Sequence, residues 1–166
     1  MAMDPERTPT FMQILEMASF VEAGDLVPQP GDVTDVCTIC FIGERLVLVR
    51  PDADSPWDLL MGEAHPHETV QEASERVVLQ RACMKGTMWT LLGYFSVPTD
   101  DGDALVACSS VMVEPDGVHT PDTEGPTPTM KVVELPDIRN YLPMTSRLSA
   151  LLHRADAARP SIQSGL

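Results

Sequence analysis

The chain has 166 residues, of which 43% are hydrophobic, a size and composition that suit one domain able to bury its own core. Its net charge of -14 excludes a broad basic surface for nucleic acid, and leaves small nucleotides only a local basic pocket. The sequence shows neither a long apolar run nor a signal-peptide pattern, and has only four cysteines, so we expect a cytoplasmic protein outside the membrane.

The amino-terminal segment is expected to be helical. Thr8 and Pro9 are typical of a helix start, and apolar residues then recur at helical spacing, so we expect a helix to about Ala23, stopped by Gly24. The residues from 1 to 31 would then form an amino-terminal helix and linker. A self-association role for this helix is one interpretation, and packing on its own sheet is the other.

The next elements are predicted from β-branched runs and turn residues. Two strands, 36–42 and 45–50, flank a tight turn at Gly43, and a long loop from 51 to 68 follows. A stretch without Gly or Pro predicts a central helix over 68–84.

The carboxyl-terminal half adds a second antiparallel pair and a helix. The expected elements are strands 87–97 and 104–114, a surface loop at 115–128, a strand at 130–135 and a helix from about Thr145. We expect a mixed α/β domain over residues 32–158 and a disordered tail over 159–166.

The central helix and the loop before it resemble the Nudix (MutT-like) hydrolase superfamily. The family's box has a glycine, a glutamate and an arginine at fixed spacing, which Gly62, Glu68 and Arg76 match, and the aliphatic Val78 also fits. Trp57 and Leu59 match the lead-in that often precedes the box. This resemblance, over residues 33 to 155, implies a Nudix-like α/β/α sandwich with a mixed sheet, a central box helix, an extra N-terminal helix and a C-terminal helix.

The box departs from the family pattern at its metal-binding positions. The resemblance places the family's metal-binding glutamates at Val77, Gln80 and Arg81, and its closing glycine at Cys83. Three glutamates would carry -3, whereas these residues sum to +1. Because hard Mg²⁺ prefers carboxylate oxygens, we expect Mg²⁺-dependent pyrophosphate hydrolysis to be lost. The box is degenerate, and the protein is then a ligand-binding, regulatory or interaction domain without a cofactor.

An active hydrolase of a nucleoside diphosphate derivative is the alternative, with Mg²⁺ or Mn²⁺ as cofactor. Glu68, Glu72 and Arg76 are its candidate catalytic residues, and loop carboxylates such as Glu63 or Glu114 could supply non-standard ligands. A fold member repurposed for other chemistry also fits. Glu72 can pair with Arg76 at the i, i+4 spacing.

A small nucleotide or other phosphorylated molecule is the expected partner, with no nucleic acid and a homodimer as an open alternative. Its candidate ligand-binding residues are Trp57, Gly62 and Arg81. Trp57 could stack on a base, although core packing is the commoner fate of such a ring. Arg81 could bind a phosphate through its planar guanidinium, or be a solvated surface residue.

Two further patterns raise the question of a metal. Glu63, His65, His67 and Glu68 cluster before the helix and could hold zinc or another transition metal, against the alternative of exposed loop histidines. Cys37 and Cys40 form a C-x-x-C pattern. On a strand, however, residues three apart point to opposite faces, so we expect no joint ligation there.

Overall fold

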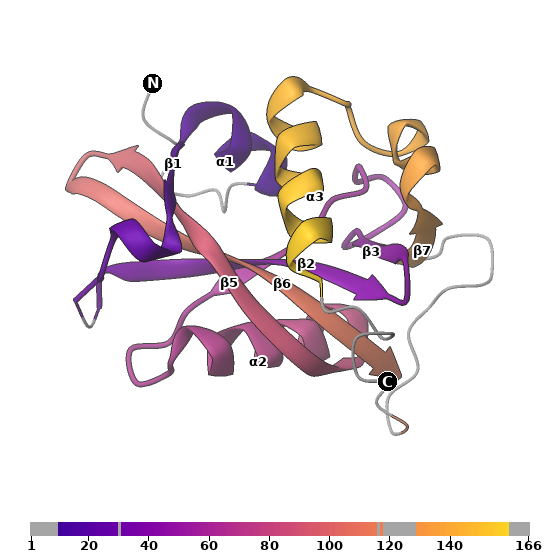
Figure 1. The fold of residues 1–166 in the computed structure, drawn as a ribbon, viewed down its shortest axis with the longest axis horizontal. Helices are drawn as coiled ribbons and strands as arrows, with labels where there is room; N and C mark the ends of the chain where they lie inside the picture. The colour runs from indigo at the N-terminus through magenta and orange to yellow at the C-terminus, as the bar shows by residue number, and fades with distance from the viewer. Residues whose placement is uncertain (1–9, 30, 116, 118–128, 160–166) are drawn as a thin grey trace.

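The computed structural model describes residues 10–29, 31–115, 117 and 129–159, which form a sheet with helices on both faces (Figure 1). The strands are β1 Ser19–Glu22, β2 Val33–Ile42, β3 Arg45–Val49, β4 Leu60–Glu63, β5 Met84–Thr99, β6 Gly102–Pro115 and β7 Met130–Glu134. The helices are α1 Phe11–Met17, α2 Val70–Ala82 and α3 Ser146–Ala158, with short 3₁₀ turns η1 Ala23–Asp25 and η2 Leu135–Asn140. None of the described helices is long and apolar enough to cross a membrane.

The described strands form one mixed sheet in the order β1-β5-β6-β2-β3-β7. Strand β2 runs parallel to β6, whereas the other pairs are antiparallel. The edge of β2 that faces away from β6 is shared: its first half pairs with β4, and its last two residues pair with β3. Strands β3 and β4 therefore diverge from a common neighbour.

Two apolar layers hold the helices against the sheet. On one face, Val77 and Val78 of α2 pack with Val36 and Cys40 of β2. On the other face, α1 and α3 pack with a separate cluster that includes Cys37, and Figure 1 shows these two helices on the opposite side of the sheet from α2. Cys37 and Cys40 thus lie on opposite faces, as the strand period predicts, and the expected α/β/α sandwich with a mixed sheet is confirmed.

The prediction for the first helix is wrong at both ends. Helix α1 begins after an N-cap at Thr10, two residues beyond Thr8, and ends at Met17 rather than near Ala23. Residues Ser19–Glu22 instead become β1, which pairs with β5 from Gly93 to Ser96. Pairing with β5 provides hydrogen-bond partners for the backbone groups of Ser19–Glu22. The spacing of apolar residues does not reveal this pairing. The amino-terminal segment is therefore built into the same sheet and core.

The other elements match the predictions closely, with two additions. Strands β2, β3, β5, β6 and β7, the turn at Gly43 and a helix capped by Thr145 all appear where the sequence indicates. Strand β4 lies inside the stretch expected to be loop, and η2 follows β7. Most of the predicted loop 115–128 and the tail after Arg159 lie outside the described residues.

Candidate functional site

Helix α2 begins and ends with specific local contacts. Thr69 is its N-cap, and its hydroxyl accepts the N–H of Glu72 while the Glu72 carboxylate accepts the N–H of Thr69. This reciprocal capping box satisfies backbone donors at the helix start. The helix ends at Cys83, which has a left-handed backbone with φ of +55°. The closing position of the box thus adopts the conformation that favours glycine.

Arg76 is bound to Glu68 and not to Glu72. Its Nε lies 2.8 Å from Glu68 Oε2 and its Nη2 lies 2.9 Å from Oε1. Arg76 also donates to the backbone carbonyl of Glu63 and to the side-chain oxygen of Gln80. The predicted pair between Glu72 and Arg76 is therefore wrong, because the loop fold brings Glu68 back onto the helix and Glu72 caps the helix instead.

The ion pair with Arg76 lowers the pKa of the Glu68 carboxyl group. The side chains of Arg76 and Glu68 are 22% and 19% exposed, so water still reaches both. Hydrogen bonding by Arg76 lowers the pKa of Glu68 from 4.5 to about 2, and the backbone N–H of His65 adds to the effect. Glu68 is thus a charged anchor for the loop between β4 and α2, already occupied by a cation from the protein.

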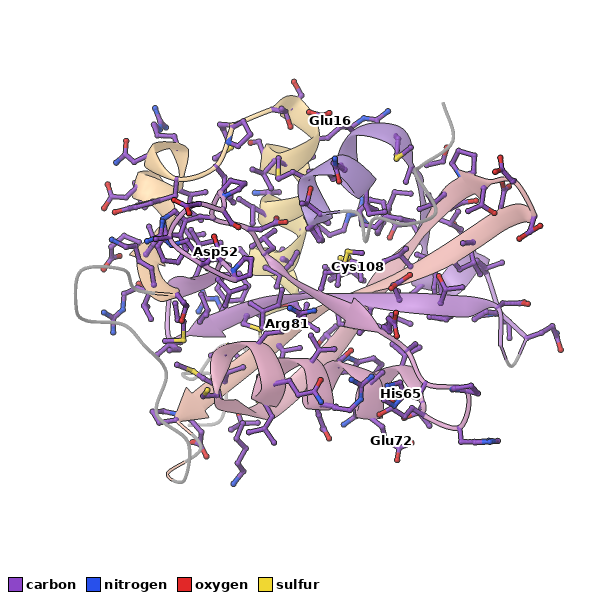
Figure 2. The ribbon with its side chains drawn as sticks, turned by 180° about the vertical axis from the view of Figure 1, so that it is seen from behind. Glu16, Asp52, His65, Glu72, Arg81 and Cys108 are labelled. Carbon is purple, nitrogen blue, oxygen red and sulfur yellow. The ribbon has the colours of Figure 1, made fainter. Side chains whose placement is uncertain are left out.

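The positions that the family resemblance assigns to metal binding have different environments. Val77 is 1% exposed and packs under β4, because a Cβ atom on Gly62 would lie 2.6 Å from Val77 Cγ2. Gln80 and Arg81 are exposed on the last turn of α2. Figure 2 shows Arg81 apart from His65 and Glu72, which lie near each other at the amino end of the helix.

Gln80 and Arg81 line a cleft of about 590 Å³. Its other walls come from the end of β3 and the two residues after it, the two residues that lead into β4, Met61 of β4, Thr129 before β7, and the amino end of α1 with Thr10 and Phe11. The volume lies in the range of pockets that bind small molecules. Arg81 makes no hydrogen bond or ion pair with any residue that the structure describes, so its charge faces the cleft without a partner there.

Asp58 also lines the cleft, although no sequence pattern marked it as a candidate site residue. Its carboxylate accepts the backbone N–H groups of Phe11 at 2.9 Å and Leu59 at 2.8 Å. Burial raises the pKa of Asp58 from 3.8 to about 6, although hydrogen bonds from Leu59, Phe11 and Met12 oppose the shift. Phe11 lies 47 positions away in sequence, so only the tertiary fold makes this contact visible.

Trp57 contacts two cationic side chains and is not itself among the described residues that line the cleft. The guanidinium of Arg50 lies 4.2 Å from its ring centroid and the Lys131 ammonium lies 5.9 Å away. Arg50 itself lines the cleft. Gly62 is buried beside Val77 and is likewise not among the described lining residues. Of the three predicted ligand-binding residues, only Arg81 reaches the cleft.

The predicted metal ligands are not brought together as a donor set. His65 Nδ1 lies 3.6 Å from Glu68 Oε1, but both oxygens of Glu68 are bound by Arg76. Within the described part of the chain, no group of three or more His, Cys, Asp or Glu side chains is arranged to hold a metal ion. Glu63 and His67 are exposed, and Glu114 pairs with Lys85.

The same residues do not fit a magnesium site on α2. Val77 offers no donor, Gln80 offers one neutral amide oxygen and Arg81 brings a positive charge. Magnesium favours carboxylate and water oxygens in near-octahedral geometry. Glu68, Glu72 and Arg76, the predicted catalytic residues, lie outside the described cleft lining.

The structure resembles solved Nudix hydrolases. The pyrophosphohydrolase RppH of Bacillus subtilis is 17% identical with a TM-score of 0.64, over 91% of this chain and 96% of that one. A Nudix hydrolase from Nitrosomonas europaea is 17% identical with a TM-score of 0.58, over 81% and 95%. An ADP compounds hydrolase is 18% identical with a TM-score of 0.56, over 81% and 80%.

No protein-family model and no curated protein matches the sequence. At identities this low the structural likeness establishes the fold and leaves the activity open. The chain has the Nudix fold, as the spacing of Gly62, Glu68 and Arg76 predicts.

Proposed function

We propose that this chain is a Nudix-fold protein that has lost Mg²⁺-dependent pyrophosphate hydrolysis and binds a small phosphorylated ligand in the cleft beside α2. The observation that carries the proposal is Arg81. It occupies a position that the family resemblance assigns to a metal-binding glutamate, and it presents a positive charge to the cleft. A cation in that place favours an anion where a hydrolase would need a divalent metal.

Electrostatics disfavours a divalent cation beside Arg81 and favours an anion there. An arginine about 4 Å from a divalent cation costs on the order of 8 kcal/mol at an effective dielectric near 20, before screening. The same guanidinium can donate two parallel hydrogen bonds to a phosphate or carboxylate. Because the chain carries a net charge of -14, a local cation in a cleft is also the feature that overcomes long-range repulsion of anions.

The residues that match the family's pattern and the residues that depart from it have separate physical roles. Gly62, Glu68 and Arg76 shape the loop and attach it to α2 through packing and an ion pair. These residues are not among the described residues that line the cleft, whereas Gln80 and Arg81 are. A protein can therefore retain the box geometry while its cleft binds without hydrolysing. A cytoplasmic setting suits this role, since all four cysteines are free thiols.

The test uses calorimetric titration in EDTA against a panel of nucleotides, nucleotide sugars and inorganic pyrophosphate. Binding without a divalent cation is the expected result. Arg81→Ala should weaken it roughly ten- to a hundredfold, the effect of losing hydrogen bonds to a charged group. Arg45→Ala is the matched control, because Arg45 is an exposed arginine on β3 outside the cleft lining.

The hydrolase alternative is tested by phosphate release in Mg²⁺ and Mn²⁺. Robust metal-dependent release that a point substitution in this protein abolishes would overturn the proposal. Light scattering tests the interaction role separately. The buried side chains of α1, those of Phe11, Ile14 and Leu15, already pack within this chain. A homodimer formed through α1 would therefore have to use the exposed face of the helix, and it stays a prediction.

A further inference from the structure

Charged side chains of opposite sign hold the two ends of α1. At the amino end, the Asp58 carboxylate accepts the N–H of Phe11 at 2.9 Å. At the carboxyl end, Nη1 of Arg147 from α3 lies within hydrogen-bond distance of three carbonyl oxygens, those of Leu15 at 2.9 Å, Glu16 at 3.0 Å and Ala18 at 3.1 Å. The Asp58 carboxylate binds at the amino end of the helix and the Arg147 guanidinium binds carbonyl oxygens at its carboxyl end. The helix dipole favours both placements.

Helix α1 depends on these contacts for its position. It has seven residues, and a helix that short is not stable alone in water. A capping box between Thr10 and Gln13 stabilises its first turn, but contacts within the helix do not fix where it lies on the sheet. Burial of three apolar side chains and the two charged attachments provide that position.

The position of α1 matters because its first turn is a wall of the cleft. Thr10 and Phe11 line the cleft, whereas Leu15 and Ala18 line a different cavity of about 300 Å³ at the other end of the helix. Arg147 lines that second cavity and is not among the described residues around the cleft. Because the described hydrogen bonds of Arg147 go to α1 and to Ala18 directly after it, α1 is the element that links Arg147 to the cleft.

We infer that Arg147 is a positioning residue for the cleft: from α3 it fixes the carboxyl end of α1, and so sets where Thr10 and Phe11 stand beside Arg81. This inference rests on the proposed function for its meaning, because it concerns ligand binding in the same cleft. In this role Arg147 affects ligand binding without lining the cleft.

The first test follows α1 directly by amide hydrogen exchange. In Arg147→Ala, the N–H groups in the first turn of α1 should exchange faster by roughly tenfold or more, since charge-assisted bonds at the far end are lost. Amides of the central strand β2 should keep their wild-type rates. Arg147→Lys retains a cation and should restore part of the protection.

The matched control is Arg154→Gln, a substitution two turns further along α3. Arg154 pairs with Glu22 of β1 and donates no hydrogen bond to α1 within the described residues. It should leave exchange in the first turn of α1 unchanged. Equal acceleration of α1 in both variants, or of α1 and β2 together in Arg147→Ala, would show a general loss of stability and overturn the inference.

The second test measures binding of inorganic pyrophosphate in EDTA. Arg147→Ala should weaken binding severalfold, Arg147→Lys should weaken it less, and Arg154→Gln should not change it. Failure of the wild type to bind the nucleotide panel or pyrophosphate would refute the proposed function, while the exchange data would still report on α1. Unchanged exchange and unchanged affinity in Arg147→Ala would refute this inference alone.

Discussion

The guanidinium of Arg76 holds both carboxylate oxygens of Glu68, at 2.8 Å and 2.9 Å, across eight residues of loop and helix. This fork-to-fork arrangement is the strong form of an ion pair, because two parallel bonds fix the orientation as well as the distance. It closes the loop between β4 and α2 through two side chains of opposite charge. The pair therefore makes the loop sensitive to acid.

Stability should fall when Glu68 is protonated. Its pKa is lowered from 4.5 to about 2 in the folded protein, so its contribution is complete above 4.5 and is lost as the pH falls from there toward 2. Urea unfolding at several pH values between 6 and 2 measures this loss. Glu68→Gln should have a flatter profile over that window, and a profile as steep as that of the wild type would contradict the assignment.

Asp58 should have the opposite pH dependence. Its folded pKa is raised from 3.8 to about 6, so its contribution is complete below 3.8 and is lost as the pH rises through 6. A decrease on the order of 1 to 3 kcal/mol in the free energy of unfolding is expected across that interval. Asp58→Asn should remove this slope between pH 4 and 7. An identical slope in the variant would assign the effect to another group.

Glu68 and Asp58 show which parts of the candidate site can be predicted from the sequence. The spacing of Gly62, Glu68 and Arg76 predicted the fold and the box, because a local motif carries its own geometry. The partner of Arg76 was mistaken, since the i, i+4 rule describes an isolated helix and ignores a loop that folds back. Asp58 was missed altogether, because its partner Phe11 is 47 positions away and no local pattern signals the contact.

The missed strands have a similar cause. Strand β4 has four residues, and β1 also has four, too few for a clear alternation of apolar and polar side chains. Both exist because longer strands offer them an edge, β2 for Leu60–Glu63 and β5 for Ser19–Glu22. Tertiary pairing decided these elements, whereas the box helix was predictable from its own residues.

Cys83→Gly should stabilise the protein. Cys83 has a φ of +55° at the end of α2, where a Cβ atom is strained by about 1 to 2 kcal/mol. Glycine relieves this strain but gains freedom in the unfolded chain, so the expected net gain in the free energy of unfolding is about 0.5 to 1 kcal/mol. Cys83→Ala keeps the Cβ atom and should give no such gain. Equal stability of the glycine and alanine variants would argue against strain as the cause.

Gly62→Ala should destabilise the contact between β4 and α2. The added Cβ atom would lie 2.6 Å from Val77 Cγ2, so one side chain or the backbone must move, at a cost of about 1 to 3 kcal/mol. In a Val77→Ala background the same change should cost less, since the clashing methyl group is gone. Thermal or urea unfolding of the four proteins in this cycle measures the coupling, and additive effects would mean that the two residues do not clash.

The divided edge of β2 has a consequence for how such a cleft can diversify. Its first half pairs with β4 and its last two residues pair with β3, while Val49 at the end of β3 and Asp58 just before β4 exchange two backbone hydrogen bonds of 2.9 Å. The connection from Arg50 to Trp57 leaves this bridge as a loop, and its first two residues, Arg50 and Pro51, line the cleft. Changes in its length or composition can widen or narrow the opening while the registers of both strands stay fixed. New ligand preferences can therefore arise there with little disturbance to the interior.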